Sequence, residues 1–201
     1  MTAILKTSPD APAPLAADGR RRRGEDNRAR IVAAMLEIVQ GGEIAPSAEQ
    51  VALRADVGLR TVFRHFNDMD SLYREMSDVI AVEVHAMVDQ PFRAPDGPEQ
   101  VIELVHRRAQ VFEKIGPFKR ASAAFRHRSK FLDSDGARLV RMLRELLLRV
   151  LPAGLASDPS RVEVLDLLLS FESWSRLRRE QGLSTAQAQE VLTAAVRRLI
   201  V

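Results

Sequence analysis

A chain of 201 residues is long enough for one large domain or two small ones with a hydrophobic core. Hydrophobic residues make up 46% and charged residues 28%, as in globular proteins, and no run of about eighteen apolar residues predicts a transmembrane helix. The absence of cysteine excludes disulfides and a thiol nucleophile, and a net charge of +3 is too small to indicate nucleic acid by itself. We expect a cytoplasmic protein without a signal peptide and without membrane contact.

The start of the chain is predicted to be a disordered tail that ends in a basic arm, over residues 1–23. Residues 1–19 contain three prolines, several alanines and little apolar periodicity. Four consecutive arginines follow, namely Arg20, Arg21, Arg22 and Arg23. Such a run could reach into a DNA minor groove or along phosphates, and the alternative is an ordinary solvated charge run.

Residues 24–70 are predicted to form a three-helix headpiece that contains a helix-turn-helix. An apolar stripe predicts a first helix from about Asp26 to Gln40, which Gly41-Gly42 ends. In the stretch SAEQVALRADVGLRTVFRHF, Ser47 followed by Gln50 is a capping-box pattern that places the start of the second helix. Asp56-Val57-Gly58 then makes a tight turn, where Gly58 carries no Cβ penalty.

The third predicted helix has a buried side and an exposed side. Val62 and Phe66 lie one turn apart toward the core, whereas Leu59, Arg60 and Arg64 lie on another face. A short helix that presents arginines outward beside a crossing partner has the geometry that enters a DNA major groove. Periodicity alone leaves open an ordinary helical corner with solvated arginines.

The charge of the headpiece is balanced. Between Arg28 and Arg74, six arginines stand against six acidic residues, so this block is neutral. The local positive field is therefore expected to come mainly from the arginines of the basic arm.

The same stretch resembles the operator-reading segment of the TetR-like transcriptional regulators. That family's pattern runs Ala-x-x-Ala-Gly-Val-Ser-x-Gly-Thr-(Leu/Val)-(Tyr/Phe)-x-His-Phe, with a Lys and a Leu after a short polar step. The matching residues are Ala52, Ala55, Val57, Thr61, Val62, Phe63, His65, Phe66 and Leu72. The resemblance contains no gaps, extends from Arg28 to about Met76, and continues more loosely to the C-terminus.

The stretch also departs from the family pattern. Asp56 stands where the family usually has Gly, and Gly58 where it usually has Ser. Phe63 and Met69 lack the Tyr hydroxyl and the Lys ammonium that make two customary phosphate contacts.

The resemblance implies that the headpiece binds a pseudo-palindromic operator in double-stranded DNA. Besides the basic arm, the residues expected to meet DNA are Ser47, Leu59, Arg60, Thr61, Phe63, Arg64 and His65. We expect base contacts from Arg60 and Arg64, and contact of Leu59 with a thymine methyl group. Thr61, His65 and the amides at the start of the second helix would hold phosphates.

Residues 71–201 are predicted to be helical, which makes the chain all-α with about nine helices. Caps at Asn67 and Asp68 begin a long fourth helix, and Gly97-Pro98 begins a fifth, which Gly116-Pro117 closes. A short sixth segment follows to about Arg126. The later helix starts, at Asp133–Gly136, Asp158-Pro159 and Ser184 with Gln187, give a seventh, an eighth that continues to Trp174, and a ninth.

The last two predicted helices are apolar on more sides than one intrachain neighbour requires. In the TetR-like family these helices form a four-helix bundle with their copies in a second subunit, so the resemblance also implies a homodimer. The residues expected at the dimer interface are Leu165, Leu168, Val191, Ala195, Val196 and Leu199.

The resemblance further implies a pocket for a small-molecule effector in this part of the chain, the effector-binding and dimerisation domain. The residues expected to line it are Phe92, His106, Phe112, Phe125, Met142 and Trp174. Aromatic and methionine side chains in helical stripes are more often plain core, and the sequence does not choose between the two interpretations.

No pattern predicts an enzyme, a metal site or a cofactor. The four histidines are scattered, with neither an HExxH spacing nor a cysteine to join them. We therefore expect a DNA-binding regulator, in the simplest case a repressor that a small molecule releases from its operator. The alternative is a helical protein–protein interaction module that keeps the headpiece without operator binding.

Overall fold

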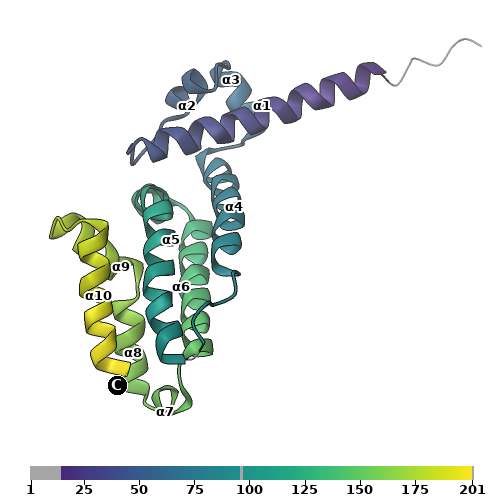
Figure 1. The fold of residues 1–201 in the computed structure, drawn as a ribbon. Coiled ribbons are helices and arrows are strands. Elements are labelled where there is room, and N and C mark those ends of the chain that lie inside the picture. Colours follow the sequence, from purple (N-terminus) through teal and green to yellow (C-terminus); the bar gives the residue numbers. More distant parts are fainter. Residues whose placement is uncertain (1–14, 96, 201) are drawn as a thin grey trace, which may run out of the picture.

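The computed structural model describes residues 15–95 and 97–200, and every regular element in those ranges is a helix (Figure 1). The headpiece comprises α1 (Leu15–Gln40), α2 (Ala48–Arg54) and α3 (Leu59–His65), and α4 (Met69–Val88) joins it to a larger body. The body contains α5 (Gly97–Phe125), α6 (Lys130–Val150), α7 (Ala153–Ala156), α8 (Pro159–Leu168), α9 (Phe171–Ser175) and α10 (Thr185–Ile200), with helical turns at Arg126–Arg128 and Arg176–Glu180. The predicted all-α architecture is confirmed. None of the helices in the described ranges combines the length and the apolar character needed to cross a membrane.

Several helix ends have the local causes that the sequence predicted. The Ser47 hydroxyl accepts a hydrogen bond from the Gln50 amide, and the Gln50 side chain accepts one from the Ser47 amide, which completes a capping box. Asp68 caps α4 in the same way, and Ser184 caps α10. At the end of α1, Gly42 adopts a φ of 103°, which favours glycine and stops the helix.

Helix α1 begins at Leu15, well before the predicted start near Asp26. The run of arginines from 20 to 23 is therefore helical, which corrects the predicted disordered tail for residues 15–23; residues 1–14 lie outside the described residues. The physical reason is that extending a helix already packed at Ile31 needs no new nucleation, and alanine, leucine and arginine favour it. In Figure 1 the N-terminal half of α1 projects beyond α2 and α3.

Helix α5 continues through Pro117 to Phe125, so the predicted break at Gly116-Pro117 is wrong and the predicted sixth helix is the last part of α5. A residue before proline leaves the α region mainly because its Cβ and its N–H clash with the proline ring. Gly116 has no Cβ, which removes much of that clash. Helix α6 also begins earlier than predicted, because Ser129 rather than Asp133 caps it.

The predicted eighth helix is divided at Leu169, where α8 ends and Ser170 caps α9. The division coincides with Arg108, a buried residue of α5 that is 3% exposed. Its guanidinium donates to the Leu169 carbonyl at 2.6 Å and also to the Leu143 carbonyl of α6. Burial lowers the pKa of Arg108 to about 10, although the nearby carboxylate of Asp166 opposes this shift. One buried cation thus joins α5 to α6 and to the end of α8.

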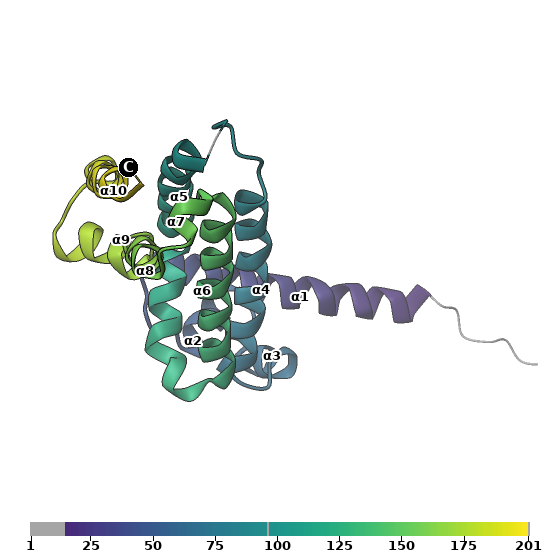
Figure 2. The same ribbon diagram turned by 90° about the horizontal axis from the view of Figure 1, so that it is seen from below.

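Two hydrophobic cores meet along α4. The headpiece core includes Phe66 of the loop after α3 and Met76 of α4, and extends to Phe118 of α5. The body core surrounds α5, which lies between α4 and α6 on one side and α8 to α10 on the other (Figures 1 and 2). Ile80 of α4 packs against both cores, so the headpiece is docked on the body rather than tethered to it.

The turn between α2 and α3 takes its positive φ at Asp56, with a value of 52°, whereas Gly58 has a φ of −69° and is the N-cap of α3. This corrects the expectation that Gly58 supplies the conformational freedom of the turn. Asp tolerates the left-handed region better than most residues. Arg30 reinforces the turn, since its guanidinium donates to the Ala55 carbonyl at 2.5 Å and the Asp56 carbonyl at 3.2 Å.

Substitution of Asp56 tests this turn. Asp56→Val should lower the free energy of unfolding by about 1–3 kcal/mol, because a β-branched residue is strained at positive φ. Asp56→Gly should not lower it, since glycine adopts this φ without strain. Urea unfolding of both variants and the parent measures the difference, and equal stability of the Val and Gly variants would contradict the positive φ.

Candidate nucleic-acid interface and internal cavity

The outer face of α3 is open to solvent, as its periodicity predicted. Val62 is 2% exposed and faces the headpiece core. On the other side Leu59 is 38% and Phe63 48% exposed, and Arg60 and Arg64 are exposed beside them. The face therefore offers two cations and two apolar side chains over seven residues.

Four of the six arginines between Arg28 and Arg74 form ion pairs within the chain. The pairs are Arg28–Glu75, Arg30–Asp56, Arg54–Glu37 and Arg74–Asp70. For Arg60 and Arg64, the described residues provide no such carboxylate partner. The block from Arg28 to Arg74 is neutral by composition, yet its two unpaired arginines lie together on the exposed face of α3.

Arg28 of α1 fixes the end of α3. Its Nε donates to Glu75 Oε1 at 2.9 Å on α4, and its Nη1 donates to the His65 carbonyl at 2.7 Å. The guanidinium also lies 4.4 Å from the centroid of the Phe66 ring, within the range of a cation–π interaction. Arg28 thus connects α1, on which it lies, to the end of α3 and to α4.

The surroundings of His65 favour its neutral form. Burial lowers the pKa of His65, and the positive charges of Arg64 and Arg28 lower it further. Its Nε2 atom is buried and has no hydrogen-bond partner in the described structure. A phosphate contact from this side chain would therefore have to use Nδ1.

The other residues expected to meet DNA lie around the same surface. The Ser47 hydroxyl is occupied by the capping box, which leaves the exposed start of α2 to offer backbone amides. Thr61 is half-buried on α3. Arg22 is exposed on α1, and the side chains of Arg20, Arg21 and Arg23 lie outside the described structure.

A cavity of about 210 Å³ lies between α4, α5 and α6, directly below the headpiece. Its lining is mostly apolar. The lining residues are Met76, Ser77, Ile80, Ala81, Val84 and His85 from α4, Ile115, Phe118, Lys119 and Ser122 from α5, and Asp135, Arg138, Leu139 and Met142 from α6. Three helices therefore contribute to one largely apolar pocket.

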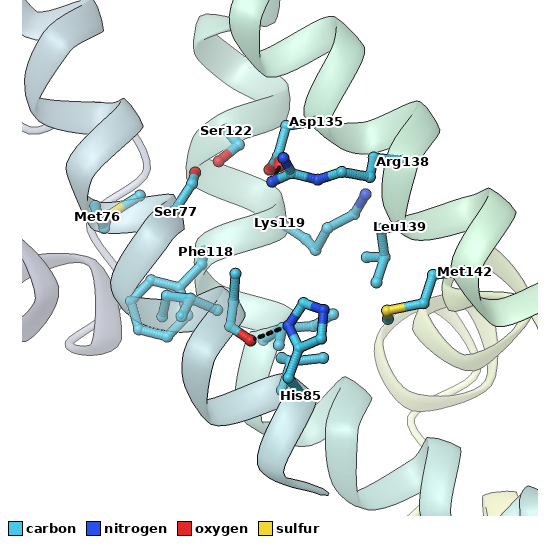
Figure 3. A pocket seen from close by; sticks show the side chains of 14 residues that line it. Met76, Ser77, His85, Phe118, Lys119, Ser122, Asp135, Arg138, Leu139 and Met142 are labelled. Carbon is cyan, nitrogen blue, oxygen red and sulfur yellow. Dashed lines mark hydrogen bonds and ion pairs between the residues drawn. The ribbon is translucent and has the colours of Figure 1, made fainter. Parts of the chain in front are cut away.

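The polar groups of the cavity gather toward one end, as Figure 3 shows. Lys119, Asp135 and Arg138 lie there with the hydroxyl groups of two serines. Arg138 and Asp135 form an ion pair one helical turn apart on α6. His85 lies toward the other end, and its Nδ1 donates to the Ala81 carbonyl at 2.6 Å.

The residues expected to line an effector pocket are not brought together. Met142 lines the cavity, whereas Phe112 and Trp174 line a polar depression between α5 and α9. His106 faces a shallow groove beside α10, and the Phe125 ring stacks on Tyr73 with centroids 4.8 Å apart. The Phe92 ring lies 4.2 Å from the Arg107 guanidinium.

Sequence reasoning missed the contribution of α4 and of Lys119 to the cavity. The apolar stripe of α4 predicted a buried face of that helix but not the cavity beside it. Because a break was predicted at Gly116-Pro117, Lys119 was not assigned to the same helix as Ile115, and its position in the lining could not be inferred. A continuous α5 would have placed Ile115, Phe118 and Ser122 on the same face.

Comparison with solved structures places this arrangement in a known fold. A protein described as a transcriptional regulator, SCO7518 from Streptomyces coelicolor A3(2), aligns with a TM-score of 0.60 and 23% identity over 87% of this chain and 98% of its own. A TetR transcriptional regulator from Rhodococcus sp. RHA1 aligns with a TM-score of 0.54 and 18% identity over 87% and 95%. The chain has the TetR-like fold.

A further similar structure is the multidrug binding protein EbrR complexed with imidazole, with a TM-score of 0.54, 22% identity, and coverage of 87% of this chain and 94% of that one. The sequence matches no protein-family model and no curated protein. At these identities the similarity is one of fold, and the residues that read DNA or hold a ligand have to be argued from this chain.

In this TetR-like chain the last helices leave an apolar face uncovered. Leu165 and Val196, two residues expected at the dimer interface, are fully buried within their own subunit. Val191 is 46% exposed, and Leu168, Ala195 and Leu199 are half-buried. Leu167, at 65% exposure, and Val164, at 43%, are further exposed apolar residues of α8, which the sequence analysis did not place at the interface.

The lowered pKa of His65 makes a prediction about stability. Because the unfolded chain takes up this proton first as the pH falls through about 6.5, the free energy of unfolding should decrease below that pH. The free energy of unfolding continues to decrease until the pH falls below the pKa of His65 in the folded protein. His65→Gln removes this contribution, so its stability should fall less steeply between about pH 7.5 and pH 5.5. Urea titrations at stepped pH measure both slopes, and identical slopes would contradict the lowered pKa of His65.

Proposed function

We propose that this protein is a homodimeric DNA-binding transcriptional regulator that recognises a pseudo-palindromic operator through α3. The observation that carries the proposal is the pair of unpartnered arginines on the exposed face of a helix-turn-helix whose other arginines are internally paired. Charge left unpaired on one short helix has no role in holding the headpiece together. It is suited to guanine edges and phosphates.

The geometry supports distinct roles for the exposed residues. Arg60 and Arg64 can reach base edges from the outer face, and Leu59 can contact a thymine methyl group. Thr61 and the amides at the start of α2 are suited to phosphates, because they flank that face. The arginines at 20 to 23 add positive charge on the projecting part of α1.

The regulator is proposed to respond to a small molecule in the cavity between α4, α5 and α6. Glu75 binds Arg28 on one side of α4, and the next residue, Met76, lines the cavity. A ligand that displaces Met76 or Ile80 would therefore move the helix that anchors the end of α3. In a dimer, that movement changes the distance between two headpieces and lowers operator affinity, which is the behaviour of a repressor released by its effector.

Two alanine substitutions test operator reading. Arg64→Ala should weaken binding to the preferred operator by about 1–3 kcal/mol and binding to random DNA much less, because a base contact carries sequence information. Arg93→Ala is the charge-matched control, since Arg93 lies in the loop between α4 and α5, at the end of the body away from the headpiece. Fluorescence anisotropy of the parent and both variants, with the DNA that flanks the gene and with a random duplex, gives the six affinities.

Other outcomes have definite meanings. Equal weakening on both DNAs would make Arg64 a phosphate contact rather than a base contact. If the parent protein binds no DNA above the level of the random duplex, the headpiece does not read an operator, and a helical protein–protein interaction module becomes the better description. The position of Met69, half-buried where a phosphate-binding lysine would reach outward, favours that second candidate.

The proposed homodimer is supported by the uncovered apolar face on α8 and α10. Val164 and Leu167 on α8 and Val191 on α10 are exposed in the single subunit. Burial of both copies of this face around a two-fold axis would remove them from water. Leu165 and Val196 are expected to support this face from inside the subunit rather than to cross the interface.

The dimer prediction uses an exposed position so that folding and assembly are separated. Leu167→Glu should give a folded monomer, because a carboxylate at the interface would be buried without a partner while the isolated subunit tolerates it. Val140→Glu on α6, where Val140 is 52% exposed, is the control and should remain dimeric. Light scattering after gel filtration measures the mass, and a dimeric Leu167→Glu variant would place the interface elsewhere.

A further inference from the structure

The cavity contains one cation that the protein does not neutralise. We propose that the ligand of this cavity is a small apolar monocarboxylate whose carboxylate pairs with Lys119, an inference that rests on the proposed function of the cavity as an effector site. The chemistry of the ligand follows from the charges, the volume and the arrangement of the lining.

The charged side chains of the lining leave one positive charge without a negative partner. Among the side chains that line the cavity, Lys119 and Arg138 are cationic and Asp135 is anionic. Asp135 and Arg138 pair with each other, so their charges cancel. Lys119 makes no ion pair with any carboxylate in the described ranges, and its Nζ instead lies 5.7 Å from the centroid of the Phe171 ring. One ligand carboxylate would complete the balance.

The surroundings of Lys119 make that charge costly without a ligand. Burial lowers the pKa of Lys119, while the more distant carboxylates of Glu172 and Asp135 raise it and the positive charge of Arg126 lowers it. Burial is the largest of these effects. A carboxylate in direct contact would favour the charged ammonium and would itself be bound more strongly than in water, because the surrounding walls are mostly apolar.

The volume limits the size of the ligand. Apolar cavities of about 150 Å³ in proteins accept benzene, so a cavity of about 210 Å³ suits a ligand only slightly larger. The apolar walls come from Ile80, Val84, Ile115 and Leu139. A hydrocarbon part of this size fits against them, and a bulky multi-ring compound does not.

The arrangement of the lining residues predicts which end of the ligand lies at which end of the cavity. In Figure 3 the ammonium of Lys119 lies toward Arg138, and the hydroxyls of Ser77 and Ser122 lie toward the same end. Phe118 and Met142 lie toward the opposite end, where the hydrocarbon part of the ligand would pack.

The test compares octanoate with octanamide, which has the same number of non-hydrogen atoms and no charge. Isothermal titration calorimetry of the full chain without DNA should show octanoate binding at least about tenfold more tightly. Lys119→Met should abolish this preference and leave octanamide binding unchanged, which also shows that the variant is folded. Lys114→Met is the matched control, since Lys114 lies on the same helix but pairs with Glu83 at 2.8 Å, and it should retain the preference.

Three results would overturn the proposal: equal affinity for octanoate and octanamide, a preference that survives Lys119→Met, or no binding of either compound at millimolar concentrations. Operator release is measured separately by adding octanoate to the protein–DNA complex. Octanoate binding that depends on Lys119 but leaves the complex intact would uphold the ligand class and contradict the regulatory role of the cavity. Release of the operator by octanoate and octanamide alike would uphold the regulatory role of the cavity and contradict the carboxylate preference.

Discussion

The position of the DNA-facing helix depends on the guanidinium of Arg28. Helix α3 has seven residues, too few to be stable as an isolated helix, so its orientation has to come from tertiary contacts. Val62 and Phe66 supply the apolar part of that anchorage, and Arg28 supplies the polar part by joining the His65 carbonyl to Glu75. Because both partners are partly exposed, the strength lies in the several contacts made by one planar group rather than in a single ion pair.

Helix α4 connects this anchorage to the cavity. It carries Glu75 toward the headpiece and Met76, Ile80 and Val84 toward the cavity or the cores. A rigid helix shared by two packed regions can bias both, provided that it has two positions of similar energy. A cavity walled by this helix and lying next to the anchor is the arrangement that such a response requires.

Several structural arginines have partners within the chain, whereas the cations proposed to bind DNA or a ligand lack carboxylate partners in the described structure. Arginines that hold the fold have partners within it: Arg30 and Arg54 pair with carboxylates in the headpiece, and the buried Arg108 donates to two carbonyls. The cations without carboxylate partners in the described structure include Arg64 on the exposed face of α3 and Lys119 in the cavity. Both proposals concern cations whose charge remains for a ligand outside the chain.

The sequence by itself determined the features whose causes are local. Ser47 with Gln50 and Asp68 start helices because a side chain satisfies amides three residues away, and Val62 faces inward because a helix repeats every 3.6 residues. The tertiary structure alone decided where helices continue and which side chains meet. Pro117 is kept inside α5 because both ends of that helix are packed, and Asp56 takes the positive φ that a glycine was expected to supply. The cavity could not be predicted, because its walls come from three helices whose register and packing are set by contacts between residues far apart in the chain.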